Sequence, residues 1–284
     1  MNDARLRIAF AGLHPDRARE LRDRFGGAAG ALRAIEGARV KASQHVREAA
    51  AVDAATRRRQ LESLGVEVVF GGDPAYPEYL DRYEDAPDLL FVRGRLPDQP
   101  GVAIVGTRKC TAYGRELARA YGQASAEAGW PVISGLARGI DGEAHRGMIE
   151  AGGIGVAVLG CGIDVAYPRE HERLGKQLLD TGGAIVTEYP PGTTPDGWRF
   201  PPRNRIIAGL SAAVVVVEAA RTGGALITAV KAAEYGIPVF AMPGDVDRAS
   251  SEGCNLLIRD GAFPVLDPAD LVEELGLVHD LVTR

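Results

Sequence analysis

The run Val102-Ala103-Ile104-Val105-Gly106-Thr107-Arg108-Lys109 is an apolar segment that passes directly into a glycine and two cations. Further short apolar runs follow along the chain, and stretches of helical periodicity separate most of them. Strands that are apolar on both faces and alternate with helices are typical of a parallel sheet covered on both sides. The sequence therefore predicts an α/β domain of Rossmann type, with a doubly wound, mainly parallel sheet, over 101–284. Its other strands are expected at 132–133, 156–159, 184–186, 214–217 and 239–242.

The composition is that of an ordinary globular chain. Of the 284 residues, 46% are hydrophobic and 25% are charged, which argues against extensive disorder. No apolar run reaches the roughly 18 residues of a membrane span, and Met1–Gly12 is too charged for a signal peptide. The net charge of -5 gives the whole chain no attraction for polyanions, so any nucleic acid must be held by a local basic site.

The cysteines Cys110, Cys161 and Cys254 lie far apart, without a CxxC pair. This spacing argues against a disulfide framework and a zinc site, and it predicts a reduced, cytoplasmic setting. Neither a metal nor a cofactor is expected, and no membrane partner. Nothing near Cys161 in the sequence favours its thiolate, so it is expected to be a small residue in a tight loop rather than a nucleophile.

The chain ahead of residue 101 has a different pattern. A small helical module is expected over 1–64, because apolar positions recur at helical spacing in three segments, 15–25, 28–35 and 43–64. The cluster Arg57-Arg58-Arg59 is expected on a solvated helix face, with a nucleic-acid contact as the alternative. Residues 65–100 read as a connecting strand and a proline-rich segment, and whether they join the Rossmann-type domain is left open.

The turn after the first strand of the main domain is a candidate anion site. Ligands of such sheets bind beyond the carboxyl ends of the strands. Gly106 permits close approach of the backbone, free amides at a helix start favour an anion, and Arg108 and Lys109 add full positive charge. The spacing matches neither a dinucleotide-binding fingerprint nor a P-loop. The sequence therefore predicts a phosphate site at Gly106, Thr107, Arg108 and Lys109.

The ends of two further predicted strands place anion-receptive groups at the same edge of the sheet. Ser134 and Gly135 offer a hydroxyl and an accessible amide, and Gly223-Gly224 opens another helix. Asp141 and His145 lie one helical turn apart. A helix cap and a histidine on a helix face are the preferred interpretation of these two residues, and an acid–base pair is the alternative.

Residues 198–211 read WRFPPRNRIIAGLS, with arginines interleaved among aromatic residues. Arginine offers forked contacts to phosphate, and aromatic rings offer stacking faces for unpaired bases. The sequence therefore predicts nucleotide or nucleic-acid contacts here, from Arg199, Phe200, Arg203, Asn204 and Arg205, with Trp198 as a further stacking face. Because no catalytic set of recognisable spacing accompanies them, binding is favoured over cleavage and no enzyme activity is expected.

Several of these motifs occur in a fixed order: AIVGTRK at 103–109 with Tyr113-Gly114, SGLARGID at 134–141 with Ala144-His145, Tyr167-Pro168, Phe200-Pro201 with RNRIIAGLS at 203–211, and Pro243-Gly244 with Gly253, Asn255 and Leu256. Together they closely resemble the DprA/Smf family of DNA-processing proteins over about 101–262. Long motifs in the right order are far more specific than any single glycine loop.

The resemblance implies a protein that binds single-stranded DNA without sequence preference and promotes loading of RecA recombinase onto it in DNA uptake, transformation and recombination. It also implies an extended Rossmann fold, a sterile-alpha-motif-like N-terminal module and a homodimer. The dimer contact is expected at Leu256, Leu257 and Ile258. The alternative is that all three side chains enter the core of the monomer.

The chain departs from the family pattern at a few positions. Thr107 and Thr187 stand where serine is common, and both keep a hydroxyl; His171 replaces an asparagine usual after the Tyr-Pro motif. The chain also stops soon after a last helix near Leu271, so the C-terminal winged-helix domain of many relatives is expected to be absent.

The main alternative function is a nucleotide-binding Rossmann enzyme such as a phosphoribohydrolase. Glu188 or Glu218, near Gly223-Gly224, would then act on an N-glycosidic bond. The P-G-G-x-G-T signature of that group is missing, and the Arg203-Asn204-Arg205 segment would have no use in the reaction.

Overall fold

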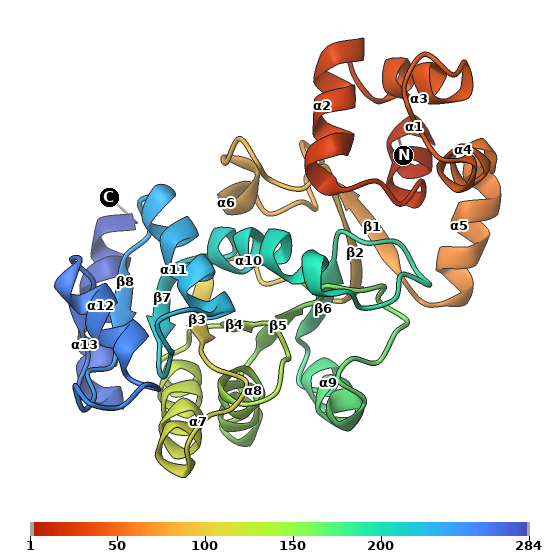
Figure 1. The fold of residues 1–284 in the computed structure, drawn as a ribbon. Helices are drawn as coiled ribbons and strands as arrows, with labels where there is room; N and C mark the ends of the chain where they lie inside the picture. Colours follow the sequence, from red (N-terminus) through yellow and green to blue (C-terminus); the bar gives the residue numbers. More distant parts are fainter. Residues whose placement is uncertain (1–2, 283–284) are drawn as a thin grey trace.

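Nine strands form one mixed sheet in the computed structural model, which describes residues 3–282 (Figure 1). Their order is β1-β2-β6-β5-β4-β3-β7-β8-β9. From β6 to β9 the neighbours pair in parallel, whereas β1 and β2 add an antiparallel edge. The predicted mainly parallel sheet is confirmed; positions 283 and 284 of the predicted domain lie outside the described residues. The strands are β1 (Glu67–Phe70), β2 (Leu89–Gly94), β3 (Gly101–Val105), β4 (Val132–Ser134), β5 (Gly155–Val158), β6 (Ala184–Thr187), β7 (Ser211–Val216), β8 (Val239–Ala241) and β9 (Phe263–Pro264).

Helices cover both faces of the sheet, as the sequence predicts. One face carries α7 (Ala112–Glu127), α8 (Ile140–Glu150) and α9 (Glu172–Asp180), and the other carries α10 (Phe200–Gly209) and α11 (Gly224–Glu234) (Figure 1). Successive side chains of β3 point to opposite faces, so Val102 and Ile104 join one core and Ala103 and Val105 join the other. The remaining elements of the main domain are α6 (Glu78–Asp81), η1 (Arg169–His171), η2 (Gly197–Arg199), α12 (Glu252–Arg259) and α13 (Pro268–Val282).

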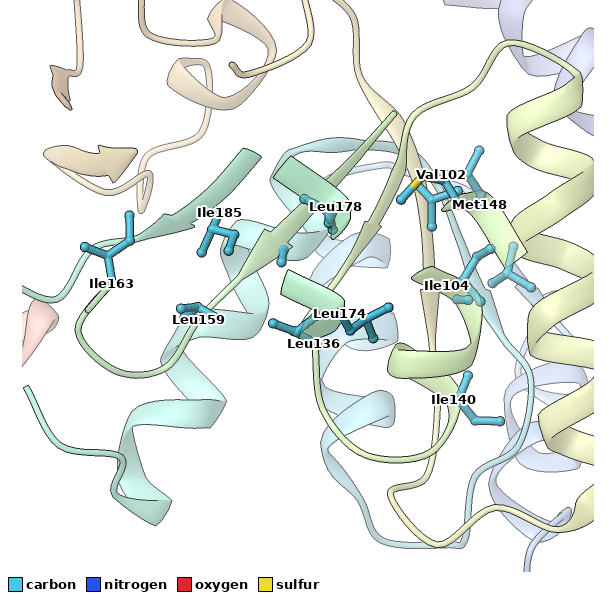
Figure 2. Packing of buried hydrophobic residues seen from close by; sticks show 14 of the residues in the cluster. Val102, Ile104, Leu136, Ile140, Met148, Leu159, Ile163, Leu174, Leu178 and Ile185 are labelled. Carbon is cyan, nitrogen blue, oxygen red and sulfur yellow. The ribbon is translucent and has the colours of Figure 1, made fainter. Parts of the chain in front are cut away.

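The core under α8 fixes the position of the turn after β3. Figure 2 shows Val102 and Ile104 beside Ile140 and Met148 of α8, and all four side chains are fully buried. Burial of each large aliphatic side chain contributes roughly 1.5–3 kcal/mol. This packing holds the first turn of α8 against the end of β3, which is where the candidate anion turn begins.

The N-terminal module contains five helices within the described residues, where the sequence predicted three: α1 (Asp3–Phe10), α2 (Pro15–Phe25), α3 (Ala28–Glu36), α4 (Gln44–Ala51) and α5 (Ala54–Ser63). The prediction of one helix over 43–64 is wrong in one respect, because two helices, α4 and α5, occupy this segment. Val52 is extended, and the Asp53 carboxylate accepts a hydrogen bond from the Thr56 amide at 2.9 Å, which starts α5 anew.

The segment 65–100 supplies β1 and β2 to the same sheet as the Rossmann-type strands. β2 pairs with β6, so Phe91 lies opposite Thr187. Between the two strands, the buried Tyr76 hydroxyl donates to the Pro87 carbonyl at 2.7 Å and closes the proline-rich connection. The helical module lies beyond this antiparallel edge (Figure 1).

Candidate nucleic-acid interface

A cleft of about 520 Å³ lies at the carboxyl ends of β3 and β7, and we call it the sheet-edge cleft. It brings together three segments that the sequence singled out separately: the turn after β3, the start of α10 and the glycine pair before α11. Its lining includes Gly106, Thr107, Arg108, Phe200, Arg203, Asn204, Gly223 and Gly224.

The turn after β3 is built so that its cations face solvent. A Cβ at Gly106 would lie 2.5 Å from Ile140 Cγ1 and 2.8 Å from the Glu218 carbonyl, so only glycine fits there. The Thr107 amide donates to that same carbonyl at 2.7 Å, and its hydroxyl accepts from the Lys109 amide at 3.2 Å. These bonds fix the turn, and Arg108 and Lys109 remain exposed.

Arg108 and Phe200 form the centre of the cleft. The Arg108 guanidinium lies 4.7 Å from the centroid of the Phe200 ring, and the centroid of the Tyr167 ring lies 5.5 Å from that of Phe200. Tyr167 is 37% exposed. A cation beside aromatic rings suits a phosphate with a neighbouring unpaired base. The sequence did not single out Tyr167 as a contact, although the Tyr167-Pro168 motif was a signal for it.

Arg203 lies at the floor of the cleft and is only 4% exposed. It donates to the carbonyls of Gly135, at 3.1 Å, and Val158, and through Nε to the Asn204 amide oxygen at 3.2 Å. Its neighbour is the buried Asp141, which accepts from the Gly135 amide at 3.1 Å. Burial lowers the pKa of Arg203 and raises that of Asp141, and the charge of each partly offsets the shift of the other.

Nε and Nη1 of Arg203 are thus bonded to the protein, so this side chain ties the ends of β4 and β5 together beneath the cleft and adds positive charge to it. The nucleic-acid contact expected at Arg203 stays a prediction. The expected cap of α8 by Asp141 is wrong: the cap position is Gly139, and the Asp141 carboxylate instead holds the turn after β4.

Arg205 points away from the sheet-edge cleft. Its guanidinium forms a two-pronged ion pair with Glu188, at 2.8 and 2.7 Å, and donates to the Asp85 carbonyl at 2.7 Å. Both side chains of the pair are 9% exposed. This side chain therefore ties α10 to the segment before β2, and the nucleic-acid contact expected at Arg205 stays a prediction. The same pair occupies Glu188, one of the two carboxylates that the alternative enzyme would need.

Ser134 is also enclosed. Its hydroxyl is fully buried and donates to the Ile104 carbonyl at 2.7 Å, which ties β4 to β3. Gly135 supports the site indirectly, since a Cβ there would lie 2.2 Å from Arg203 Nη1. Arg199 donates to the Thr194 carbonyl at 2.7 Å and lines a different cleft, on the side of the helical module.

The start of α11 is open to a ligand. Gly223 occupies the cap position without a side-chain cap, and a Cβ there would meet nothing within 4 Å. The Asn204 amide donates to the Gly224 carbonyl at 2.9 Å and fixes this glycine pair to α10. Free amides at the positive end of the helix dipole favour an anion at this point.

The other polar candidates are internal. His145 is fully buried, neither ring nitrogen has a hydrogen-bond partner within the described part of the chain, and burial lowers its pKa to about 3. Cys161 is buried, and burial raises the pKa of its thiol to about 11. His171 Nδ1 lies 2.9 Å from the Leu136 carbonyl, so this departure from the family pattern supports the turn after β4.

Glu218, the second carboxylate of the alternative enzyme, faces the start of α7. Its Oε2 accepts from the amide of Thr111 at 3.0 Å and lines a separate pocket. Among the residues that the structure describes, no group of three or more His, Cys, Asp or Glu side chains is placed to hold a metal ion. Over the same residues, no helix has the length and apolar character needed to cross a membrane.

The chain matches the family model described as DNA recombination-mediator protein A over residues 67–276. It is 44% identical to Protein Smf of Escherichia coli (strain K12) over 202 residues, which cover 70% of this chain and 54% of that protein. It is 41% identical to DNA processing protein DprA of Streptococcus pneumoniae over 204 residues, covering 71% and 72%. The chain thus spans about half the length of Smf from E. coli, and likewise 53% of Smf from Synechocystis.

Two solved structures are similar over most of their length. The X-ray structure of DprA from Streptococcus pneumoniae superposes with a TM-score of 0.79 at 33% identity and covers 94% of this chain and 95% of that one. DNA processing protein A from Helicobacter pylori, described for its single-stranded DNA binding mode, superposes with a TM-score of 0.65 at 25% identity, covering 74% and 95%.

Proposed function

Since this chain belongs to the DNA recombination-mediator protein A family, the DprA/Smf proteins, we propose that it binds single-stranded DNA in the sheet-edge cleft. The observation that carries the proposal is the exposed Arg108 beside the Phe200 ring, at 4.7 Å, opposite the uncapped start of α11. Phosphates would be held by Arg108, Lys109 and the amides of the two glycine turns, and a base would stack on an aromatic ring.

Apart from Arg199, which lines the other cleft, the expected site residues take two roles in this proposal. Those at the surface of the cleft, together with the exposed Lys109 next to it in sequence, contact DNA, and the others hold the surrounding segments in place. The contacts are Gly106, Thr107, Arg108, Lys109, Phe200, Gly223 and Gly224; the supports are Ser134, Gly135, Arg203, Asn204 and Arg205.

Binding of this kind reads no base edges, so we propose that it has no sequence preference. We further propose that the protein promotes loading of RecA recombinase onto the bound strand and that it binds DNA rather than transforming it chemically. A homodimer through Leu256, Leu257 and Ile258 belongs to the same proposal. A cytoplasmic location is supported by three cysteines that all remain free thiols.

Anisotropy of fluorescent oligo-dT tests the central proposal. Binding should weaken steeply with salt, because each phosphate contact releases counterions. A duplex of equal length should bind more weakly, since its bases are not free to stack. Equal affinity for duplex and oligo-dT contradicts the stacking contact, and turnover of nucleoside monophosphates would favour the enzyme instead.

A further inference from the structure

A second cleft, of about 470 Å³, lies between the helical module and the antiparallel edge of the sheet. We call it the interdomain cleft. The module contributes parts of α1, α2, α4 and α5, and the main domain contributes the chain around the start of β2, the segment that follows β6 and Arg205 of α10. In Figure 1 the module lies above this edge, on the same side of the sheet as α10.

The interdomain cleft has an excess of positive charge in a chain whose net charge is -5. Its charged lining consists of two carboxylates, Asp88 and Glu188, and the arginines Arg5, Arg19, Arg22, Arg57, Arg199 and Arg205. The ion pairs within this lining use Glu188 for Arg205 and Asp88 for Arg5, at 3.0 Å, and for Arg22, at 3.7 Å. Arg19 also pairs with Asp16, outside the lining, at 3.0 Å. Within the lining itself, the arginines outnumber the two carboxylates.

Arg57 and Arg199 donate hydrogen bonds to backbone carbonyls, which carry no net charge and so do not neutralise the guanidinium groups. Arg57 donates to the Ala49 carbonyl at 3.2 Å, and its buried Nε has no hydrogen-bond partner among residues 3–282. Burial lowers the pKa of Arg57, and the charge of the Asp53 carboxylate offsets part of that shift. Arg199 donates to the Thr194 carbonyl at 2.7 Å, and its distance to the Asp196 carboxylate is 4.0 Å.

One turn of chain separates the two clefts. Gly197 and Phe200 line the sheet-edge cleft, whereas Trp198 and Arg199, between them in sequence, line the interdomain cleft. Trp198 is 39% exposed, and the Arg199 guanidinium lies 4.5 Å from its ring. His14 of the module stacks on the same indole at 5.1 Å. The pairing of arginine and aromatic ring seen at Arg108 and Phe200 is thus repeated on the other side of η2.

We propose that a single strand held in the sheet-edge cleft continues across η2 into the interdomain cleft, where Arg19, Arg22 and Arg199 contact its phosphates. This inference rests on the proposed function and extends it to the helical module. A strand of DNA is favoured over an acidic protein segment for two reasons: the clefts adjoin at η2, and both combine guanidinium groups with an aromatic ring.

The test compares oligo-dT of about 6 nucleotides, enough for one cleft, with oligo-dT of about 16 nucleotides, enough for both. The double variant Arg19→Ala/Arg22→Ala should bind the short oligonucleotide as the unsubstituted protein does. Its affinity for the long one should fall by roughly tenfold, and the slope of log affinity against log salt should fall by about two. The matched control is Arg17→Ala/Arg24→Ala, which removes the same charge from the same helix outside the cleft lining.

The outcomes separate the two proposals. If neither oligonucleotide binds the unsubstituted protein, the proposed function fails. Two results overturn only the continuation into the interdomain cleft. One is equal affinity of the unsubstituted protein for the short and the long oligonucleotide. The other is an Arg19→Ala/Arg22→Ala variant that prefers the long oligonucleotide as strongly as the unsubstituted protein does. Equal losses in both double variants also overturn it, because they would reflect net charge alone.

Tryptophan fluorescence locates the strand independently. The chain has two tryptophans, so a Trp130→Phe variant leaves Trp198 as the only emitter. The long oligonucleotide should quench Trp198, and the short one should leave its emission unchanged. Quenching by neither, with both bound, contradicts the proposed path.

Discussion

Arg108 and Arg203 lie 4.7 and 6.0 Å from the ring of Phe200, yet their environments differ completely. Arg108 is exposed, whereas Arg203 is 4% exposed and bonded to two carbonyls and an amide oxygen. An exposed guanidinium is free to meet a phosphate. A buried one stabilises the turns that surround it, so the two arginines should respond differently to the same substitution.

Arg108→Ala should weaken binding of oligo-dT roughly tenfold, because a hydrogen bond to a charged group contributes about 1.5 kcal/mol. The salt slope should fall by about one, and the thermal midpoint should stay unchanged. Anisotropy titrations at several salt concentrations measure both. Arg95→Ala is the control, since Arg95 is a similarly exposed cation away from the cleft. Unchanged affinity and slope in a folded Arg108 variant would remove this residue from the site.

Arg203→Ala should instead lower the free energy of unfolding by roughly 3 kcal/mol, because it leaves the buried Asp141 carboxyl without its neighbouring cation. Urea denaturation measures this change. Stability equal to that of the unsubstituted protein, with reduced DNA binding, would return Arg203 to the set of direct contacts.

His145 should make the fold sensitive to acid. Its pKa is about 3 in the folded state against an ordinary 6.5, so between these values the unfolded chain binds more protons. The contribution of the neutral His145 to the free energy of unfolding is complete above pH 6.5. It is lost as the pH falls toward 3, by up to about 1.4 kcal/mol per pH unit. In His145→Leu this part of the pH dependence should disappear. Urea denaturation across this range checks it, and parallel curves for the two proteins would contradict the assignment.

At the scale of the element, the turn after β4 and the start of α11 use glycine for different reasons. A Cβ at Gly135 would lie 2.2 Å from Arg203, whereas a Cβ at Gly223 would meet nothing. Gly135→Ala should therefore lower the free energy of unfolding by roughly 1–3 kcal/mol, as overpacking of a dense interior does. Gly223→Ala, the matched control with an extended φ of 179°, should lower the free energy of unfolding less, since it loses only the preference of a cap position for glycine. Equal melting temperatures would show that Arg203 moves aside without cost.

The sequence predicted the central strands well because each is buried on both faces and reads as an unbroken apolar run. It predicted the short helices of the module less well: α1 has only 8 residues, and the break at Asp53 depends on one capping bond. It could not separate Arg108 from Arg203 and Arg205. Arg203 meets Gly135, 68 positions away, and Arg205 meets Asp85, 120 positions away, so their burial is decided by tertiary contacts.

At the scale of the whole molecule, assembly depends on α12. Leu256, Leu257 and Ile258 are all half-buried, and Leu257 and Ile258 pack partly against the core of their own chain. The three side chains are thus neither fully in the core of the monomer nor fully exposed. Their remaining exposed surface is available for contact with a second copy of the chain.

Ile258→Glu should yield monomers with weaker DNA binding, because an isologous contact would repeat the charge across a two-fold axis and avidity would be lost. Light scattering measures the mass. Ile154→Glu, at a position 44% exposed and outside α12, is the control and should stay dimeric. A monomeric unsubstituted protein, or a dimeric Ile258 variant, would end the dimer proposal.

The placement of the three thiols gives the protein a built-in position for a reporter dye. Cys161 and Cys254 are buried, and burial raises their pKa values to about 11 and about 12. Partial burial also raises the pKa of Cys110, but this thiol is only half-buried, and it follows Lys109 directly in the turn after β3. A maleimide fluorophore should therefore attach at Cys110 in preference to the other two, without engineering of the chain. Its emission would then follow the arrival and departure of a ligand beside Arg108 in real time.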